Sequence, residues 1–173
     1  MVQAFAELVN TVFRVAIALA LMFFITLLHE IGHIVMYRLF SGKKSWSITM
    51  GIGKPIFTTE RFIINRWFFW GGHVKWQSVP APKGHMVMWC AGGIIVNIII
   101  LTALIFAMPH LSGNIAGISQ MAINMNIVVL VITAIPMVYP SSLAGYSGMP
   151  SDGMRIYRLL RGAGNLPPES KEQ

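Results

Sequence analysis

The chain has 173 residues, of which 55% are hydrophobic and 11% are charged, and its formal net charge is +7 at pH 7. A soluble domain carries roughly 25% charged residues, and residues 86–151 of this chain contain no Asp, Glu, Lys or Arg, which excludes a soluble fold. The basic residues fall in blocks between apolar runs, a pattern typical of proteins in a lipid bilayer and not of nucleic-acid binding. We therefore predict one integral membrane domain over residues 1–173.

Three apolar runs are long enough to cross a bilayer as helices, which takes about 20 residues. They occupy residues 15–37, 86–108 and 121–139, and Pro136 lies near the end of the third, where it could break the helix. The predicted fold class is an all-α membrane protein with about three core transmembrane helices.

The segment 45–77, between the first two runs, is rich in β-branched and aromatic residues. Glycines punctuate it and predict turns near Gly51–Pro55 and Gly71–Gly72. Its four tryptophans suit the membrane interface, so we expect a short interfacial or re-entrant β-hairpin. Two roles stay open for this hairpin: it anchors the protein, or its edge strand pairs with an extended substrate.

The distribution of lysine and arginine predicts the topology. Eight of these residues lie between the first two runs and four lie after Asp152, whereas only Arg14 precedes the first run and none lies in residues 109–120. The positive-inside rule therefore places the N-terminus outside and the connection inside, with the tail 154–173 in the cytosol.

The first run contains His29, Glu30 and His33 in the sequence HEIGH, which fits the pattern H-E-x-x-H. Histidines four residues apart project from one face of a helix, about 6 Å apart along its axis, which suits two ligands of one zinc ion. Glu30 lies about 100° round the helix, where it can reach a zinc-bound water without being a ligand. Random placement would give this pattern only about 0.004 times in such a chain. Two buried histidines bonded to carbonyl groups are the alternative, but ionisable residues at membrane depth favour a functional site.

A catalytic zinc usually has three protein ligands, so the third must come from another segment. His73, His85 and His110 are candidates, although the predicted topology puts His110 on the outer side. We favour Asp152, which follows the third run on the same side as the end of the HEIGH helix. Ser151 or Asp152 could instead cap a helix over GMRIYRLLR, and a capping aspartate can still bind a metal.

Five sequence features together resemble the site-2 protease family of intramembrane zinc metalloproteases: HEIGH in the first run, GIGKPIF and FFWGGHVK in the connection, GGIIVN in the second run and SDG after the third. The resemblance covers nearly the whole chain and points to a minimal, core-only bacterial-type member. It implies that His29, His33 and Asp152 bind Zn²⁺ and that Glu30 is the general base. It also implies a multi-pass protein of the bacterial cell membrane.

Gly93 and Asn97 match a glycine and an asparagine that lie four residues apart in that family. The resemblance implies that Asn97 contacts the substrate or the oxyanion; the alternative is a hydrogen bond that packs two helices together. The chain departs from the family pattern at three places. It lacks an asparagine before Pro136 and a proline after Gly93, and the segment before Asp152 is longer by several residues.

These features lead to the hypothesis of a zinc-dependent intramembrane endopeptidase that acts in regulated intramembrane proteolysis. The expected substrate is a single-span membrane protein or a membrane-associated peptide, locally unwound; no particular oligomeric state is predicted. A non-proteolytic zinc-holding membrane protein is the alternative, and Glu30 argues against it because a structural zinc needs no adjacent base. A component of a peptide transporter has neither a nucleotide motif nor additional spans in its support.

Overall fold

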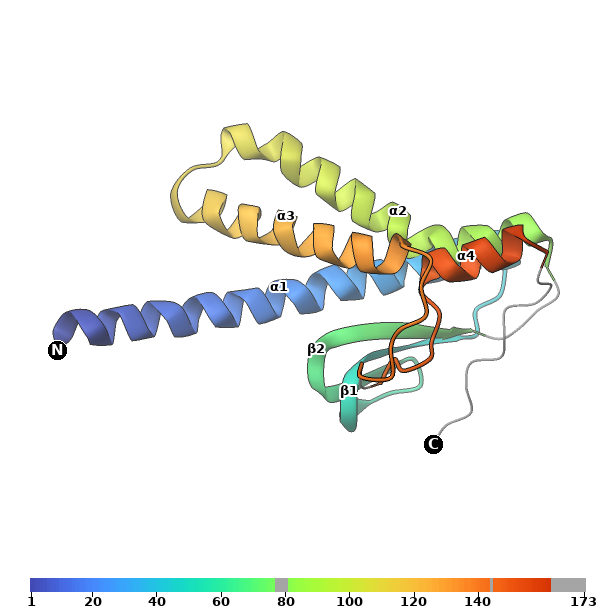
Figure 1. The fold of residues 1–173 in the computed structure, drawn as a ribbon, viewed down its shortest axis with the longest axis horizontal. Coiled ribbons are helices and arrows are strands. Elements are labelled where there is room, and N and C mark those ends of the chain that lie inside the picture. The colour runs from blue at the N-terminus through green and yellow to red at the C-terminus, as the bar shows by residue number, and fades with distance from the viewer. Residues whose placement is uncertain (77–80, 144, 163–173) are drawn as a thin grey trace.

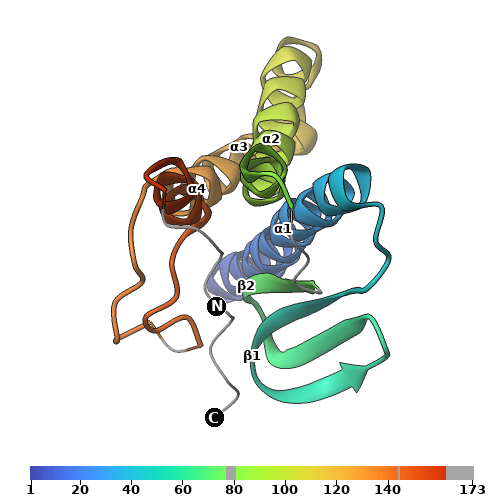
Figure 2. The same cartoon turned by 90° about the vertical axis from the view of Figure 1, so that its right-hand side faces the viewer.

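The computed structural model describes residues 1–76, 81–143 and 145–162. In chain order its elements are α1 (Val2–Ser41), β1 (Trp46–Thr58), β2 (Phe62–Trp76), α2 (Lys83–Ala107), the short 3-10 helix η1 (Met108–His110), α3 (Gly113–Ala134) and α4 (Asp152–Leu160). Figure 1 shows α2 and α3 as a helical hairpin that turns at η1, with the sheet and α4 toward the opposite end. α1 lies between α2 and the sheet (Figure 2).

Three helices in the described part of the chain are long and apolar enough to cross a membrane: Val2–Ser41, Lys83–His110 and Gly113–Ala134. The predicted number and order of apolar helices, and the small antiparallel sheet between the first two, are confirmed. The predicted span at residues 15–37 lies within α1, whose helix begins at Val2. The third helix begins at Gly113 and ends at Ala134, so residues 135–139 of the predicted third span are not in that helix.

α3 ends at Ala134, before the predicted end at residue 139, because of Pro136. A proline disfavours helical geometry in the residue that precedes it, and Ile135 is extended, with ψ of 128°. The polar first turns of α3 are helical as well, which a hydropathy profile cannot detect. The third helix is therefore displaced toward the N-terminus relative to the apolar run.

The two strands form an antiparallel sheet whose outermost pair joins Trp46 to Trp76. The chain reverses after Thr59, whose hydroxyl oxygen accepts hydrogen bonds from the backbone amides of Arg61 and Phe62. A threonine side chain that bonds the backbone two and three residues onward stabilises such a turn. The turn therefore depends on Thr59 and contains no glycine.

The glycines expected to form turns lie within the strands, in the regions where each strand folds back on itself. Met50 pairs with both Ile64 and Gly72, and Ile64 pairs with both Met50 and Phe57. Gly51 and Gly71 have positive φ values of 74° and 81°, which glycine adopts without a steric penalty. A Cβ atom on Gly51 would collide with the backbone of Trp67, and one on Gly71 would collide with the side chain of Tyr146. These glycines permit close approach between segments where the strands bend.

The sheet packs on α1 through a small apolar core. Ile34 of α1 is buried against Ile48, Met50 and Val74 of the sheet. This packing holds β2 beside the HEIGH segment. The hairpin also carries large exposed apolar side chains, as expected for a segment at a membrane interface: Ile56, Phe57, Trp67 and Trp70.

The segment between α3 and α4 closes on itself before α4 begins. The Tyr139 amide donates to the Met149 carbonyl (2.9 Å), and Val138 bridges Pro150. Ser151 then caps α4, because its hydroxyl oxygen accepts from the Met154 amide, which confirms the expected cap. Of the predicted tail 154–173, the first residues continue α4, and residues 163–173 lie outside the described chain.

Candidate metal centre

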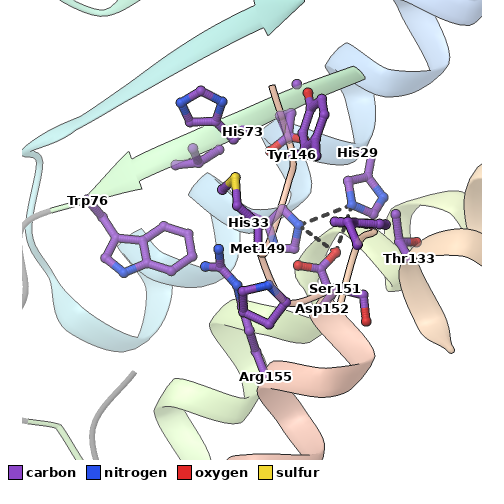
Figure 3. Close-up of a pocket in the computed structure, with 15 residues that line it drawn as sticks. His29, His33, His73, Trp76, Thr133, Tyr146, Met149, Ser151, Asp152 and Arg155 are labelled. Carbon is purple, nitrogen blue, oxygen red and sulfur yellow. Dashed lines mark hydrogen bonds and ion pairs between the residues drawn. The ribbon is translucent and has the colours of Figure 1, made fainter. Parts of the chain in front are cut away.

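Two segments far apart in the sequence bring three potential ligands together (Figure 3). His29 and His33 extend from α1, and Asp152 is the first residue of α4. Asp152 Oδ2 lies 3.0 Å from His29 Nε2 and 3.2 Å from His33 Nε2, and the two nitrogens are 3.1 Å apart. Ligands on a tetrahedral ion with bonds of 2.0–2.1 Å would be roughly 3.3 Å apart. The three residues could therefore hold one metal ion.

The hydrogen bonds of His33 indicate that this cluster needs a cation. Nδ1 lies 2.8 Å from the Trp89 carbonyl oxygen, which can only accept, so Nδ1 carries the proton. The Gly93 amide approaches the same nitrogen at 3.4 Å, too far to reverse this assignment. In a neutral imidazole Nε2 then has a lone pair, and it faces a carboxylate oxygen of Asp152. A metal ion, or a second proton on the imidazole, resolves that repulsion.

Glycines make room for the two helices and the histidine ring. A Cβ atom on Gly93 would collide with the imidazole of His29. A Cβ atom on Gly32 would collide with the carbonyl group of Gly92, and one on Gly92 would collide with the carbonyl group of Gly32. Small residues let membrane helices approach closely. Sequence reasoning noted Gly93 through the resemblance but missed Gly32 and Gly92. The paired glycines at 92–93, opposite the glycine inside HEIGH, are the only signal that could have identified this crossing.

Glu30 is buried, at 6% exposure, and lies where two cavities meet. The smaller cavity, about 70 Å³, contains all three potential ligands. The larger, about 300 Å³, is lined mainly by apolar side chains of α1, β2 and α3. The residues common to both are His29, Glu30, Gly72, Thr133, Tyr139 and Tyr146. Glu30 therefore faces a polar space that contains the ligands and an apolar space beside them.

The three other candidate ligands do not join the cluster. His73 lines the smaller cavity, whereas His85 lies in α2 and His110 in η1. In the described part of the chain, the cluster that could bind a metal consists of His29, His33 and Asp152 alone. Burial, with Lys75 and Arg155 adding to it, lowers the pKa of His73 to about 4. His73 is therefore a neutral imidazole at pH 7.

Asn97 is fully buried in α2 but lines neither cavity. Asn126 of α3 donates its side-chain amide to the backbone carbonyl of Asn97 (3.0 Å). The side-chain amide of Asn97 has no hydrogen-bond partner among the described residues. The residue thus takes part in a contact between helices, and its contact with a substrate or an oxyanion stays a prediction.

Two tyrosines from the segment between α3 and α4 close the site, and sequence reasoning missed both. Tyr139 and Tyr146 pack edge to face, with ring centroids 5.9 Å apart. Burial, reinforced by the carboxylates of Asp152 and Glu30, raises the pKa of Tyr139 to about 12, and burial also raises that of Tyr146. Both are neutral phenols at pH 7. An irregular segment has no periodicity from which their positions could be inferred.

No protein-family model, curated protein or solved structure matches the chain.

Proposed function

We propose that this chain is a zinc-dependent intramembrane endopeptidase of the site-2 protease type that cleaves transmembrane or membrane-associated peptides. One observation carries the proposal. Asp152 lies within 3.2 Å of both histidines of HEIGH, and Glu30 lines the same cavity. The arrangement provides a place for the metal and a base beside it.

Two imidazoles and one carboxylate fit zinc, which in catalytic sites takes three protein ligands and leaves one position open. When bound, zinc would supply a water of lowered pKa and polarise the scissile carbonyl. The Trp89 carbonyl fixes the orientation and tautomer of His33, as such partners do for metal-binding histidines. Asp152 contributes negative charge to the ligand set.

Glu30 is placed to move protons. It would accept a proton from the attacking water and pass it to the leaving amine, the usual work of a general base that then acts as an acid. Its carboxylate borders the smaller cavity, where that water would lie. The protein around it excludes bulk solvent, since Glu30 is buried.

The larger cavity supports an apolar peptide as the substrate. Its lining includes Phe69, Trp70, Val128 and Ile132, and Glu30 lies at its border with the smaller cavity. A peptide bond in a helix is enclosed by its own hydrogen bonds, so the substrate must unwind to present that bond. Residues 69–72 of β2 line this cavity, so an unwound segment there would run along β2, which favours the edge-strand role of the hairpin.

The decisive experiment compares wild-type protein with Glu30→Gln, both purified in detergent and loaded with zinc to equal content. Cleavage of single-span substrates should fall roughly 10²- to 10⁴-fold, the usual loss when a general base is removed, while zinc content stays the same. Equal cleavage rates would refute the role of Glu30. If the protein only holds zinc and has no protease activity, its role should be the same with glutamate or glutamine at position 30. That alternative also leaves the position of Glu30 beside the ligands unexplained.

A further inference from the structure

Arg155 is the only lysine or arginine among the described residues that lines the smaller cavity. It lies in α4, three residues after Asp152, so both side chains project from the same face of the helix. Figure 3 shows the Arg155 side chain extending from α4 into the cavity that holds the three potential ligands. None of the roles assigned above uses this residue.

The guanidinium of Arg155 has no ion pair or hydrogen bond with another described residue. The side chain is partly buried, and an arginine removed from water is normally paired. Arg155 also lies close enough to His73 to help burial and Lys75 lower the pKa of that imidazole. Other arginines of the helix differ: Arg158 lines neither cavity, and Arg161 stacks over Tyr157 at 5.4 Å.

The charges around the cavity favour an anion next to Arg155. A divalent cation held by the triad would be balanced by the carboxylates of Asp152 and Glu30. Arg155 then gives the lining of the cavity a net charge of +1. The cavity, of about 70 Å³, has room for a few waters or one carboxylate-sized group. A planar guanidinium presents two parallel N–H donors that match a carboxylate.

We propose that Arg155 is a catalytic residue that hydrogen-bonds the oxygen of the scissile carbonyl as it gains negative charge, and then holds the carboxylate of the product. This inference rests on the proposed function. In the reaction the oxygen of water bonds to the carbonyl carbon, and Glu30 accepts one proton of that water. The carbon–nitrogen bond breaks, its electron pair stays on nitrogen, and Glu30 gives that proton to the nitrogen. The second proton of the water leaves the new carboxyl group for the amine, which departs as an ammonium ion. The anion therefore forms on the carbonyl group, where Arg155 can bind it.

Product binding tests this role without turnover. The probes are two acetylated apolar tetrapeptides, Ac-Leu-Leu-Val-Phe with a free carboxylate and the same peptide with a C-terminal amide, titrated into zinc-loaded full-length protein by calorimetry. Wild type should bind the carboxylate form roughly tenfold more tightly, in line with a charge-assisted bond. Arg155→Gln should bind both forms alike, and Arg155→Lys should show a smaller preference than wild type. Arg158→Gln, which removes the same charge outside the cavity, should keep the full preference.

Kinetics give a second measurement. With a cleavable substrate, Arg155→Gln should lower kcat roughly 10²- to 10³-fold, as loss of an oxyanion donor does, with a smaller change in KM and unchanged zinc content. An Arg155→Gln protein that still prefers the carboxylate would overturn the proposal, as would equal binding of both peptides by wild type. If the glutamine variant loses zinc, an Arg155→Lys protein with undiminished preference overturns it instead. Failure of the protease proposal looks different: wild-type cleavage would then be absent or independent of Glu30, while the binding preference could still be measured.

Discussion

Two clusters of polar side chains lie among the helices, and they differ in what surrounds them. The cluster of His29, His33 and Asp152 borders a cavity, and the Nε2 atoms of the two histidines and Oδ2 of Asp152 lie within 3.2 Å of one another. The pair Asn97 and Asn126 joins α2 to α3 through a side-chain-to-backbone hydrogen bond and borders neither cavity. A buried polar residue in a membrane helix is thus a stronger functional candidate when its neighbours leave a charge unbalanced and a space open.

The two clusters also differ in the contacts that position their side chains. The histidines depend on close contacts with glycines and a backbone carbonyl, which position their rings. The asparagine pair depends on helix packing and on the hydrogen bond from Asn126 to the Asn97 carbonyl. Substitutions in the first cluster should therefore change metal binding, and substitutions in the second should change stability.

The largest effect is expected for loss of a histidine ligand. His33→Ala should reduce zinc from near one ion per chain to a small fraction, because two ligands hold a catalytic zinc poorly. Metal analysis of detergent-purified protein gives the measurement. Asn126→Ala is the matched control from the other cluster and should keep its zinc. Undiminished zinc in both His29→Ala and His33→Ala would contradict the metal site.

A smaller loss is expected when the space around His29 is filled. In Gly93→Ala the new methyl group collides with the imidazole, so zinc affinity should fall about 10- to 100-fold, the range for disturbed support of a ligand. Competition with a chelator measures it. Gly117→Ala in α3, where a Cβ atom meets nothing within 4 Å, should leave the affinity unchanged. A normal affinity in Gly93→Ala would show that the helices can separate at no cost.

His73 is ionisable and lines the cavity but belongs to neither cluster, and it should make stability depend on pH. Its folded pKa, about 4, is below the ordinary value of 6.5. Above pH 6.5 His73 is mainly neutral in both the folded and the unfolded chain, so its protonation does not reduce stability. As the pH falls from 6.5 toward 4, the unfolded chain binds a proton at His73 that the folded protein does not, and stability is lost. Between pH 7 and pH 5 the loss should be at most about 2 kcal/mol.

Thermal unfolding of wild type and His73→Gln at several pH values isolates this contribution, because the metal ligands are the same in both proteins. The glutamine variant should lose less stability on acidification. Parallel pH dependence in the two proteins would mean that His73 protonates as readily in the fold as in the unfolded chain.

The smallest effect is expected in the amide pair. Asn126→Ala removes one hydrogen bond between membrane helices, which averages about 0.6 kcal/mol. Zinc content and any cleavage activity should be retained. A loss of cleavage with normal zinc in Asn97→Ala, but not in Asn126→Ala, would instead support the predicted contact of Asn97 with the substrate or the oxyanion.

The sequence was most informative where chemistry and spacing are local. His29, Glu30 and His33 lie on one helical turn, so their geometry follows from helix periodicity, and Asp152 was favoured by its position after the third run. The structure brings these ligands together even though the segment before Asp152 is several residues longer than in the family pattern. That segment folds back on itself, because Val138 pairs with Pro150.

Other features depend on contacts that no local pattern encodes. Gly71 lies against Tyr146 and Gly72 against Glu30, and both partners are remote in sequence. In the sequence alone, Arg155 is one of the basic residues that predict the topology. Its place in the cavity became apparent only once α4 was docked beside α1 and β2.

The serine that caps α4 has a consequence for how the site assembles. Ser151 Oγ donates to the Ile135 carbonyl at 2.7 Å as well as capping the helix, so one hydroxyl joins the start of α4 to the end of α3. Two ligands are permanently side by side on α1, while the third arrives on a separately docked short helix. If an ion is bound, movement of α4 would remove its third ligand while the two imidazoles stay together. The Ser151 hydroxyl raises the effective concentration of the Asp152 carboxylate at the two imidazoles.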